Sequence, residues 1–340
     1  MPNNSDVSDV RWDWSYEVEQ PKLESLYEKA KRDQWNADVE IDWSQPVDPA
    51  GKILDPERMA LLQLEFFKQF SKSQLEAFNA HYSAWVLSNL LHGEQGALMV
   101  AGQLVAMVPD YEAKLYVASQ AMDEARHVEV FARYLRKLDK IYPVQRTLKA
   151  ILEDIVNTPH WQAKTVGMQV ILEGLALGTF INVRAATGCA LLRQLLGYVT
   201  KDEARHVAFG NVYLSTAIAD MHADDRAEVE DFAFQVTTRI VSMRRGMEGM
   251  DGFDAVLEES GIDPKDFVVA IQKEVANGFR LDSTPGAVHT LSGLVIPGVV
   301  RAGLVSDRIR PSYEAAHVKL FADTRTLEEF EQTGNVRATT

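Results

Sequence analysis

A six-residue sequence that occurs twice is the clearest chemical signal in this chain. Asp123-Glu124-Ala125-Arg126-His127-Val128 returns unchanged at residues 202–207, 79 positions later. Glu and His three positions apart lie on one face of a helix, one above the other. A single glutamate also stands 30 positions before the glutamate of each copy, Glu94 in the first half and Glu173 in the second. Four carboxylates and two imidazoles together form a ligand set for two metal ions.

Two helical hairpins are needed to bring these side chains to one place. Apolar periodicity and turn residues predict four long helices at about residues 73–108, 111–141, 158–187 and 189–221. Each expected turn, at Pro109 and at Gly188, lies 15 positions from the glutamates on either side. A helix rises about 1.5 Å per residue, so both hairpins climb and descend about 22 Å and return their glutamates to one level. Gly188 suits the left-handed conformation that often follows a helix end.

The remaining segments are expected to flank this bundle in an all-α fold. The expected parts are an N-terminal arm (1–50), a helical bundle (55–245) and a C-terminal helical extension packed on the bundle (246–340). The arm is expected to lie over the body of this chain or of a partner chain, anchored by Trp12, Trp14, Trp35 and Trp43, and the alternative is a partly disordered tail. Asp55-Pro56 and Asp263-Pro264 each indicate a helix start, with Asp as the cap and Pro at the first helical position. The apolar segment 292–303 should cover the bundle or form a subunit interface, and no segment has the pattern of a strand.

Composition argues against several classes of protein. The formal net charge of -14 argues against a nucleic-acid surface, which needs clustered Lys and Arg. Residues 1–15 are polar and lack the apolar region of a signal peptide. The longest apolar runs, 97–108 and 294–304, are too short to span a membrane. Cys189 is the only cysteine, which excludes an intrachain disulfide and a thiolate cluster, and we expect a cytoplasmic enzyme.

A single Glu-x-x-His is weak evidence for a metal, because this spacing is common on solvent-facing helices. Here the two copies are identical, and the single glutamates have apolar neighbours such as Leu98 and Leu172. A carboxylate buried among them without a partner would be costly. The other reading pairs the glutamates with Arg126 and Arg205. It is weaker, because a residue two positions after a ligand points about 200° round the helix.

The ligand types favour iron or manganese, because zinc usually takes fewer ligands in a tetrahedron. Asp123 and Asp202 lie about 100° round the helix from the adjacent glutamates and face a neighbouring helix. A ligating histidine usually donates its second N–H to a carboxylate. We therefore expect Asp202 to hold His127 and Asp123 to hold His206, across the pair. The other reading is that both aspartates face solvent.

With these residues the chain resembles the ferritin-like diiron carboxylate oxidases and oxygenases, in particular the bacterial multicomponent monooxygenase hydroxylases and the ribonucleotide reductase small subunits. The similarity rests on Gly-Glu-Gln-Gly-Ala at 93–97, on Glu173 and on the two repeated sequences, and it covers about residues 80–220. It implies a ferritin-like four-helix bundle that binds two iron ions, or manganese at one or both positions. The implied metal ligands are Glu94, Glu124, His127, Glu173, Glu203 and His206, with Asp123 and Asp202 behind them.

The resemblance further implies an enzyme that reduces O2 at a diferrous centre. We expect a diiron monooxygenase or hydroxylase that acts on a small, mainly apolar organic molecule. Carboxylate shifts of Glu173 or Glu203 would open a position for O2, which makes these two the expected catalytic residues. Gly174 and Gly178 could leave room for a substrate or could allow close helix packing. No Gly-x-Gly-x-x-Gly motif is present, so electrons should come from a separate reductase or ferredoxin. We expect a homodimer.

Two alternatives remain open. The first is a radical-generating protein like a ribonucleotide reductase small subunit. Phe131 stands where those proteins often carry the radical tyrosine, so Tyr116 or Tyr198 would have to replace it, and residues 334–340 do not suggest a docking tail. The second is a ferritin-like iron oxidase or peroxide scavenger, which is usually a shorter chain. Leu177 stands where the hydroxylases usually have a threonine, which separates this chain from them as well.

Overall fold

Helices form the secondary structure of the computed structural model, which describes residues 10–48, 53–138, 140–245, 252–278 and 288–320. No strand occurs within these ranges, where only an isolated bridge joins Leu54 to Thr187. The predicted all-α fold is therefore confirmed. The division into three parts stays a prediction, and residues 334–340, where no docking tail was expected, lie outside the described ranges.

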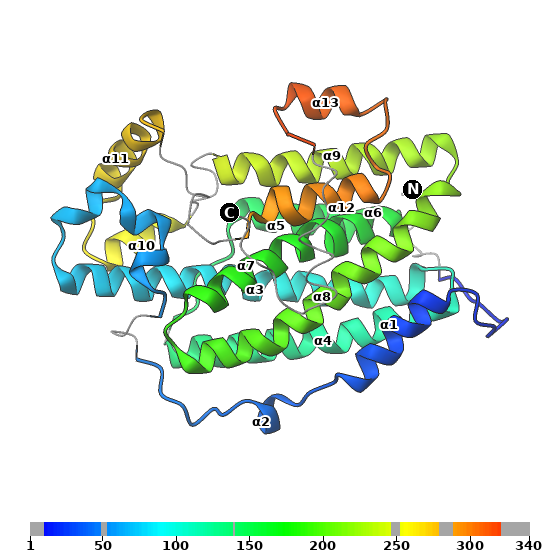
Figure 1. Ribbon diagram of the computed structural model, residues 1–340, viewed down its shortest axis with the longest axis horizontal. Helices are drawn as coiled ribbons and strands as arrows, with labels where there is room; N and C mark the ends of the chain where they lie inside the picture. Colours follow the sequence, from blue (N-terminus) through cyan, green and yellow to red (C-terminus); the bar gives the residue numbers. More distant parts are fainter. Residues whose placement is uncertain (1–9, 49–52, 139, 246–251, 279–287, 321–340) are drawn as a thin grey trace, which may run out of the picture.

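Four long helical stretches run alongside one another and form the bundle (Figure 1). The first hairpin consists of two regular helices, α3 (Lys72–Met107) and α4 (Tyr111–Lys137). The second consists of α6 (Trp161–Thr165), the π-helical η4 (Val166–Leu172), α7 (Glu173–Ala186) and α8 (Ala190–Ala219). The first three of these follow one another without a break. The predicted spans match these bounds to within about four residues, but nothing in the sequence predicted the π-helical turns.

Local sequence explains how the hairpins begin and turn. Ser71 caps α3 with a capping box, in which its hydroxyl accepts from Gln74 N–H (3.3 Å) and its own N–H donates to Gln74 Oε1 (3.1 Å). The second turn lies at Thr187 and Gly188 as predicted, but the left-handed conformation expected of Gly188 was wrong, because Gly188 is not among the glycines with positive φ. Thr187 is extended there instead, and Gly188 N–H donates to Ile53 O (3.2 Å). A tertiary contact therefore shapes this turn.

Two large apolar cores divide the bundle along its length. One contains residues 97–104 of α3 and residues 209–218 of α8. The other contains residues 78–91 of α3 and residues 191–199 of α8. The single glutamate of α3 and the repeated sequence of α8 fall between the two. The bundle thus has a polar layer near mid-height, as the equal spacing of glutamates and turns predicted.

The N-terminal arm contains a helix that the sequence analysis missed. α1 (Pro21–Arg32) packs against α4 and α8, and a short α2 (Ala37–Glu40) follows it. Trp35 is buried and Trp43 is half-buried, so these two anchor the arm as predicted. Trp12 and Trp14 are 69% and 67% exposed, so they do not anchor the arm to this chain, and an anchoring role on a partner chain stays a prediction. Their rings stack on each other instead, with centroids 5.0 Å apart.

The segment before α3 forms three short 3-10 helices where an α-helix was expected. They are η1 (Pro56–Arg58), η2 (Ala60–Gln63) and η3 (Glu65–Gln69). Asp55 caps the first as predicted, and its carboxylate accepts from Glu57 N–H (3.2 Å). The buried side chains Leu61, Leu64 and Phe67 are three positions apart. That spacing matches the three residues per turn of a 3-10 helix, so one apolar side chain per turn reaches the core.

Further helices cover the bundle (Figure 1). Those that contact the second hairpin are α9 (Ala223–Arg245), η6 (Leu291–Val295), α12 (Ile296–Arg301) and α5 (Arg146–Asn157), which also contacts α3. α10 (Phe253–Glu259) packs on α3, α11 (Pro264–Ala276) on α10, and α13 (Arg310–Ala315) on α9. α11 starts as predicted, with Asp263 accepting from Lys265 N–H (2.8 Å). The apolar segment 292–303 does cover the bundle, over η4 and α7.

One helical stretch, Trp161–Ala186, is long and apolar enough to cross a membrane by length and composition. The sequence analysis named two other segments as the longest apolar runs and overlooked this one, because polar side chains interrupt it. Of its most apolar window, 72% is buried inside the bundle. The stretch is the innermost helix of the second hairpin, and burial against its neighbours accounts for its composition.

Candidate metal centre

The six predicted ligands meet between α3, α4, α7 and α8. The ligand atoms of Glu94, Glu124, His127 and Glu203 all lie within 4.8 Å of one another, and those of Glu124, Glu173, Glu203 and His206 do so as well. All six side chains are buried, with exposed fractions of 0–4%. The two glutamates of the repeated sequences belong to both groups. The structure thus brings the six together, and their role as metal ligands remains a prediction.

The charges in this layer fit a pair of divalent cations. Within the described residues, the four glutamates form ion pairs with the two histidines but with no lysine or arginine. Asp123 and Asp202 are each paired with an arginine, so four negative charges remain. Both carboxylate oxygens of Glu203 and Nδ1 of His206 are buried without a hydrogen-bond partner in the described part of the chain. Buried polar atoms need partners, and metal ions would supply them here.

Electrostatics within the cluster point the same way. Burial, reinforced by the neighbouring carboxylates, raises the pKa of Glu94 and of Glu173 well above the ordinary range. Burial disfavours the charged form of His127 and His206, but their carboxylate partners outweigh it and hold both pKa values well above the usual one. Protons and metal ions compete for such groups, so metal binding must release protons.

Each histidine has its outer nitrogen on an aspartate from the other half of the bundle. His127 Nε2 lies 3.1 Å from Asp202 Oδ2, and His206 Nε2 lies 3.4 Å from Asp123 Oδ2. The structure therefore places the two contacts in the crossed order that the sequence suggested. Nδ1 of each ring faces Glu124, at 3.3 Å and 3.0 Å. The aspartates thus favour a proton on Nε2 and leave Nδ1 for a metal ion.

The arginines of the repeated sequences pair with these aspartates and not with the glutamates. Arg126 Nη2 contacts Asp123 Oδ1 and lies 3.2 Å from Asp202 Oδ2. Arg205 Nη2 lies 2.5 Å from Asp202 Oδ1 and 3.4 Å from Asp123 Oδ2. Residues three positions apart share a helix face, so the repeated sequence already contained this signal. The sequence analysis compared the arginines with the glutamates only and missed it.

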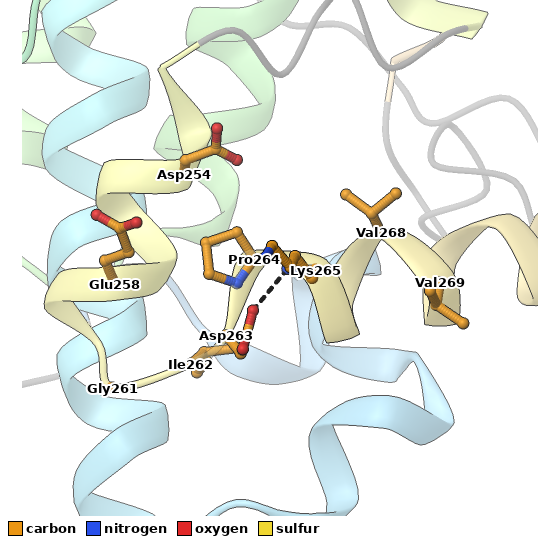
Figure 2. A pocket seen from close by; sticks show the side chains of 9 residues that line it. All are labelled: Asp254, Glu258, Gly261, Ile262, Asp263, Pro264, Lys265, Val268 and Val269. Carbon is orange, nitrogen blue, oxygen red and sulfur yellow. Dashed lines mark hydrogen bonds between the residues drawn. The ribbon is translucent and has the colours of Figure 1, made fainter.

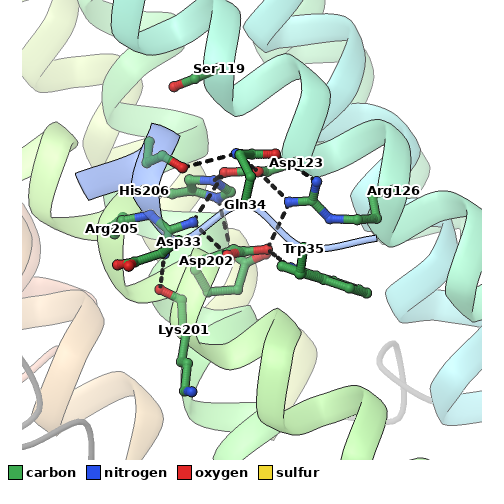
Figure 3. A network of polar contacts seen from close by, with 12 residues as sticks. Asp33, Gln34, Trp35, Ser119, Asp123, Arg126, Lys201, Asp202, Arg205 and His206 are labelled. Carbon is green, nitrogen blue, oxygen red and sulfur yellow. Dashed lines mark hydrogen bonds and ion pairs between the residues drawn. The ribbon is translucent and has the colours of Figure 1, made fainter. Parts of the chain in front are cut away.

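Two residues of the N-terminal arm complete the network (Figure 3). Trp35 Nε1–H donates to Asp202 Oδ2 (2.7 Å), and Gln34 Nε2–H donates to Asp123 Oδ1 (2.8 Å). Gln34 Oε1 accepts from Arg126 (2.8 Å), whose guanidinium lies 4.6 Å from the centroid of the Trp35 ring. The arm therefore touches the aspartate of both repeated sequences. The number of tryptophans hinted at anchoring, but no sequence pattern linked Gln34 to the site.

Two fully buried glutamines connect carboxylates on one side of the cluster. Gln120 Nε2 lies 3.1 Å from Glu124 Oε1 and 3.2 Å from Glu173 Oε1. Gln120 Oε1 accepts from Gln169 Nε2 (3.4 Å), which belongs to η4. The sequence analysis missed both residues. Gln120 precedes Glu124 by one helical turn, which was an available signal, whereas the inward orientation of Gln169 depends on tertiary packing.

Small residues in the second hairpin serve close packing. A Cβ on Gly210 of α8 would lie 2.7 Å from Gln169 Cβ, so this glycine lets η4 approach α8. A Cβ on Gly178 would lie 2.7 Å from Thr290 Oγ1, and one on Gly174 would lie 3.5 Å from Val295 Cγ2. The segment around η6 therefore fills the space beside Glu173. Of the two readings of these glycines, the structure supports close packing.

Surface pockets of the protein lie away from this cluster. One of about 830 Å³ is lined by residues of α10, the following turn and α11, among them Asp254, Glu258 and Lys265 (Figure 2). Another of about 420 Å³ lies between arm residues 10–16 and residues of α3 and α4. None of the six predicted ligands lines either pocket. We therefore place the chemistry in the buried cluster, where charge, burial and unpartnered atoms coincide.

Comparisons with known proteins gave a family match over most of the chain and similar solved structures. A model of the family described as P-aminobenzoate N-oxygenase AurF matches residues 17–259, a span that contains all six predicted ligands. No curated protein matches the chain. Two solved structures of R2-like ligand-binding oxidase variants with a Mn/Fe cofactor share 18% and 19% identity with it, each at a TM-score of 0.44. They cover 76% and 86% of this chain, which covers 94% and 95% of theirs.

Proposed function

This chain belongs to the AurF family of p-aminobenzoate N-oxygenases, and from this premise we propose that it oxygenates the nitrogen of a small, mainly apolar aromatic amine. It is an oxidoreductase of the ferritin-like diiron carboxylate superfamily. Its cofactor is a pair of iron ions, with manganese an alternative at one or both positions. The choice of an amine as the substrate goes beyond membership of the family, and the family description supports it.

The buried cluster of four carboxylates and two imidazoles is the observation that carries the proposal. Its ligand atoms lie within 4.8 Å of one another in two groups, and its net charge matches two divalent cations. When bound, the metal pair supplies the electrons and the Lewis acidity that O2 activation requires. The first oxygenation of the amine, from R–NH2 to R–NHOH, consumes one O2, two electrons and two protons and releases one water.

The side chains of the protein hold and shield the pair. The six predicted ligands would bind it, and Glu173 and Glu203 remain the proposed catalytic residues. Asp123 and Asp202 orient the two histidines. The apolar cores on both sides of the polar layer keep bulk water away, which protects an oxidising centre from side reactions.

The electrons are proposed to come from a separate reductase or ferredoxin. The chain contains no nucleotide-binding glycine motif that would let it use a nicotinamide directly. A homodimer in the cytoplasm is proposed as the working form, on the sequence argument alone.

A single-turnover experiment tests the proposed function. The full chain is loaded anaerobically with two equivalents of Fe(II), mixed with p-aminobenzoate and O2, and supplied with a chemical reductant. Mass spectrometry should detect the hydroxylamino, nitroso or nitro product, with oxygen from 18O2 on nitrogen. Glu203→Ala is the control and should give no product. Oxygen on a ring carbon would overturn the amine assignment, and Fe(II) oxidation without any organic product would identify an iron oxidase.

One observation favours a second candidate, a radical-generating protein. Tyr116 is 1% exposed, burial raises the pKa of its phenol, and its hydroxyl has no hydrogen-bond partner in the described residues. Its ring stacks on Phe209, three positions after His206, with centroids 4.5 Å apart. Phe131, at the position implied by the resemblance, stacks on Phe180. A tyrosyl radical signal after exposure to O2, lost in Tyr116→Phe, would support this candidate over the oxygenase.

A further inference from the structure

The two halves of the cluster differ in one contact that the repeated sequence does not share. Gln120 donates to carboxylates on the His206 side. The position equivalent to Gln120 in the second half, 79 positions later, is Val199, and the position equivalent to Gln169 in the first half is Leu90. The side of the cluster beside Glu173 therefore has an amide pair, one glutamine from each half, and the counterparts of this pair in the repeat are both apolar. The repeat therefore duplicates the six predicted ligands, but it does not duplicate the glutamines that bond to them.

The orientation of the Gln120 amide follows from its surroundings. Two carboxylate oxygens, Glu124 Oε1 and Glu173 Oε1, lie at 3.1 Å and 3.2 Å from one atom of this amide. That atom must be the nitrogen, because only the NH2 group can donate two hydrogen bonds and an oxygen there would be repelled. Gln120 Oε1 then points to Gln169 and accepts from its Nε2. Each N–H of Gln120 thus fixes one carboxylate.

The four carboxylates fall into two classes as a result. Glu124 and Glu173 each have an oxygen bonded to Gln120. In the described residues Glu94 Oε2 and Glu203 Oε1 each lie 3.1 Å from His127 Nδ1, and neither carboxylate is bonded to an amide side chain. Fixed carboxylates preorganise the position beside His206, where Glu173 Oε2 lies 3.7 Å from His206 Nδ1. The position beside His127 has two carboxylates that can change their mode of binding.

We propose that Gln120, held by Gln169, is a positioning residue that makes the metal position beside His206 the tighter and more rigid of the two. This inference rests on the proposed function, because it requires the cluster to bind a metal pair. Of the two proposed catalytic residues, it leaves Glu203 free to shift and open a position for O2 beside His127, while Glu173 stays held by Gln120. The burial of Gln169 against Gly210 keeps the amide pair in place.

Mn(II) titration of the metal-free full chain tests the proposal without relying on turnover. Wild type should bind two Mn(II) in two resolved steps. Calorimetry measures the two steps, and the electron paramagnetic resonance spectrum at one equivalent shows how Mn(II) is distributed between the two positions. Gln120→Met keeps the length of the side chain and removes both N–H donors. It should weaken the tighter step about 10- to 100-fold, the range for residues that support metal ligands. The weaker step should change much less, because Glu173 belongs only to the position beside His206 whereas Glu124 is shared. The spectrum at one equivalent should broaden as Mn(II) spreads over both positions.

Two further variants keep the test decisive. Gln169→Met removes only the outer amide and should weaken the tighter step by a smaller factor, so it decides the question if Gln120→Met does not fold. Gln103→Met makes the same change on α3, about 13 Å along the helix from Glu94, and should alter neither step. Equal weakening of both steps, or no weakening in Gln120→Met and Gln169→Met, would overturn the proposal. Wild type that binds fewer than two Mn(II) would instead count against the proposed function.

Discussion

The two hairpins of the bundle contain the same six-residue sequence but differ in the helix that carries the single glutamate. Glu94 lies within α3, a regular helix of 36 residues. Glu173 directly follows η4, a π-helical segment of 7 residues in which every side chain is buried. π-helical turns are rare and are frequent at functional sites. The repeat therefore supplied matching ligands, and the inner helix of the second hairpin made their surroundings different.

The comparison shows where symmetry ends in this molecule. The crossed contacts between aspartate and histidine preserve it, because each half orients the histidine of the other. The amide pair of Gln120 and Gln169 breaks it. The repeat thus duplicates the predicted ligand residues, whereas the hydrogen bonds that hold each carboxylate differ between the two sides of the cluster. Four predictions test whether the two halves of the bundle respond independently to mutation.

Removing a shared glutamate should have the largest effect. Glu203→Ala takes a ligand from both groups, so Fe(II) bound at equilibrium under anaerobic conditions should fall from two ions per chain to nearly none. Glu94→Ala takes a ligand only from the group beside His127, and the position beside His206 should keep its ion. Dialysis against Fe(II) followed by metal analysis measures both. Equal losses in the two variants would mean that the halves act as one unit.

Replacing a single aspartate with asparagine should weaken metal binding at a single one of the two positions. Asp202→Asn weakens the support of His127 and should lower metal affinity beside His127 about 10- to 100-fold. Asp123→Asn should do the same beside His206. The two steps of a Mn(II) titration separate these cases, and melting of the metal-free proteins controls for lost stability. An identical pattern in both variants would contradict the crossed arrangement.

How much of this site the sequence could predict depends on the range of the interactions. The ligand set and the crossed aspartates follow from spacing along helices, which is local. Arg126 was within reach of the same argument, because it lies three positions after Asp123. Gln169 was not, because its inward orientation requires the π-helical turns and the absence of a side chain at Gly210.

The fold shows the same division. The cap Asp263 placed the start of α11 correctly, because a cap acts within three residues. The turn at Gly188 was placed correctly, but the left-handed conformation predicted for Gly188 from local propensity was wrong, because a backbone contact with Ile53 shapes the turn. The helix α1 lies in a polar segment whose apolar residues are sufficient only when α4 and α8 cover them.

Alanine in place of glycine should have opposite effects in the two hairpins. A Cβ on Gly210 would lie 2.7 Å from Gln169 Cβ, so Gly210→Ala should destabilise the metal-free protein by about 1–3 kcal/mol. Gly102 in α3 has no atom within 4 Å of such a Cβ, and Gly102→Ala should stabilise by about 0.5–1 kcal/mol. Urea denaturation measures both. Destabilisation by Gly102→Ala would show that α3 is packed as tightly as η4.

The last expected effect depends on pH and is stronger in the second hairpin, although burial also lowers the pKa of Lys114 in the first. Lys164 is 3% exposed and donates to Val156 O (2.5 Å), and burial lowers its pKa to about 8. Between pH 8 and its ordinary pKa of 10.5, the unfolded chain holds a proton that the folded chain has lost. The free energy of unfolding should therefore rise with pH across this window, by at most about 3 kcal/mol.

Lys164→Met should remove this rise, and urea denaturation at several pH values measures it. Lys149→Met is the matched control, because Lys149 is 60% exposed and should leave the slope unchanged. The first hairpin starts at Ser71, whose cap does not titrate. A slope that survives in Lys164→Met would assign the effect to another group.

The contacts of Gln34 and Trp35 impose an order on how the protein is made. These residues leave the ribosome first, yet the aspartates that they contact follow 89 and 167 positions later. His206 is the last of the six predicted ligands along the sequence, so the predicted ligand set is incomplete until this residue has been synthesised. Gln34 and Trp35 can therefore make both of these contacts only after Asp202 has been synthesised.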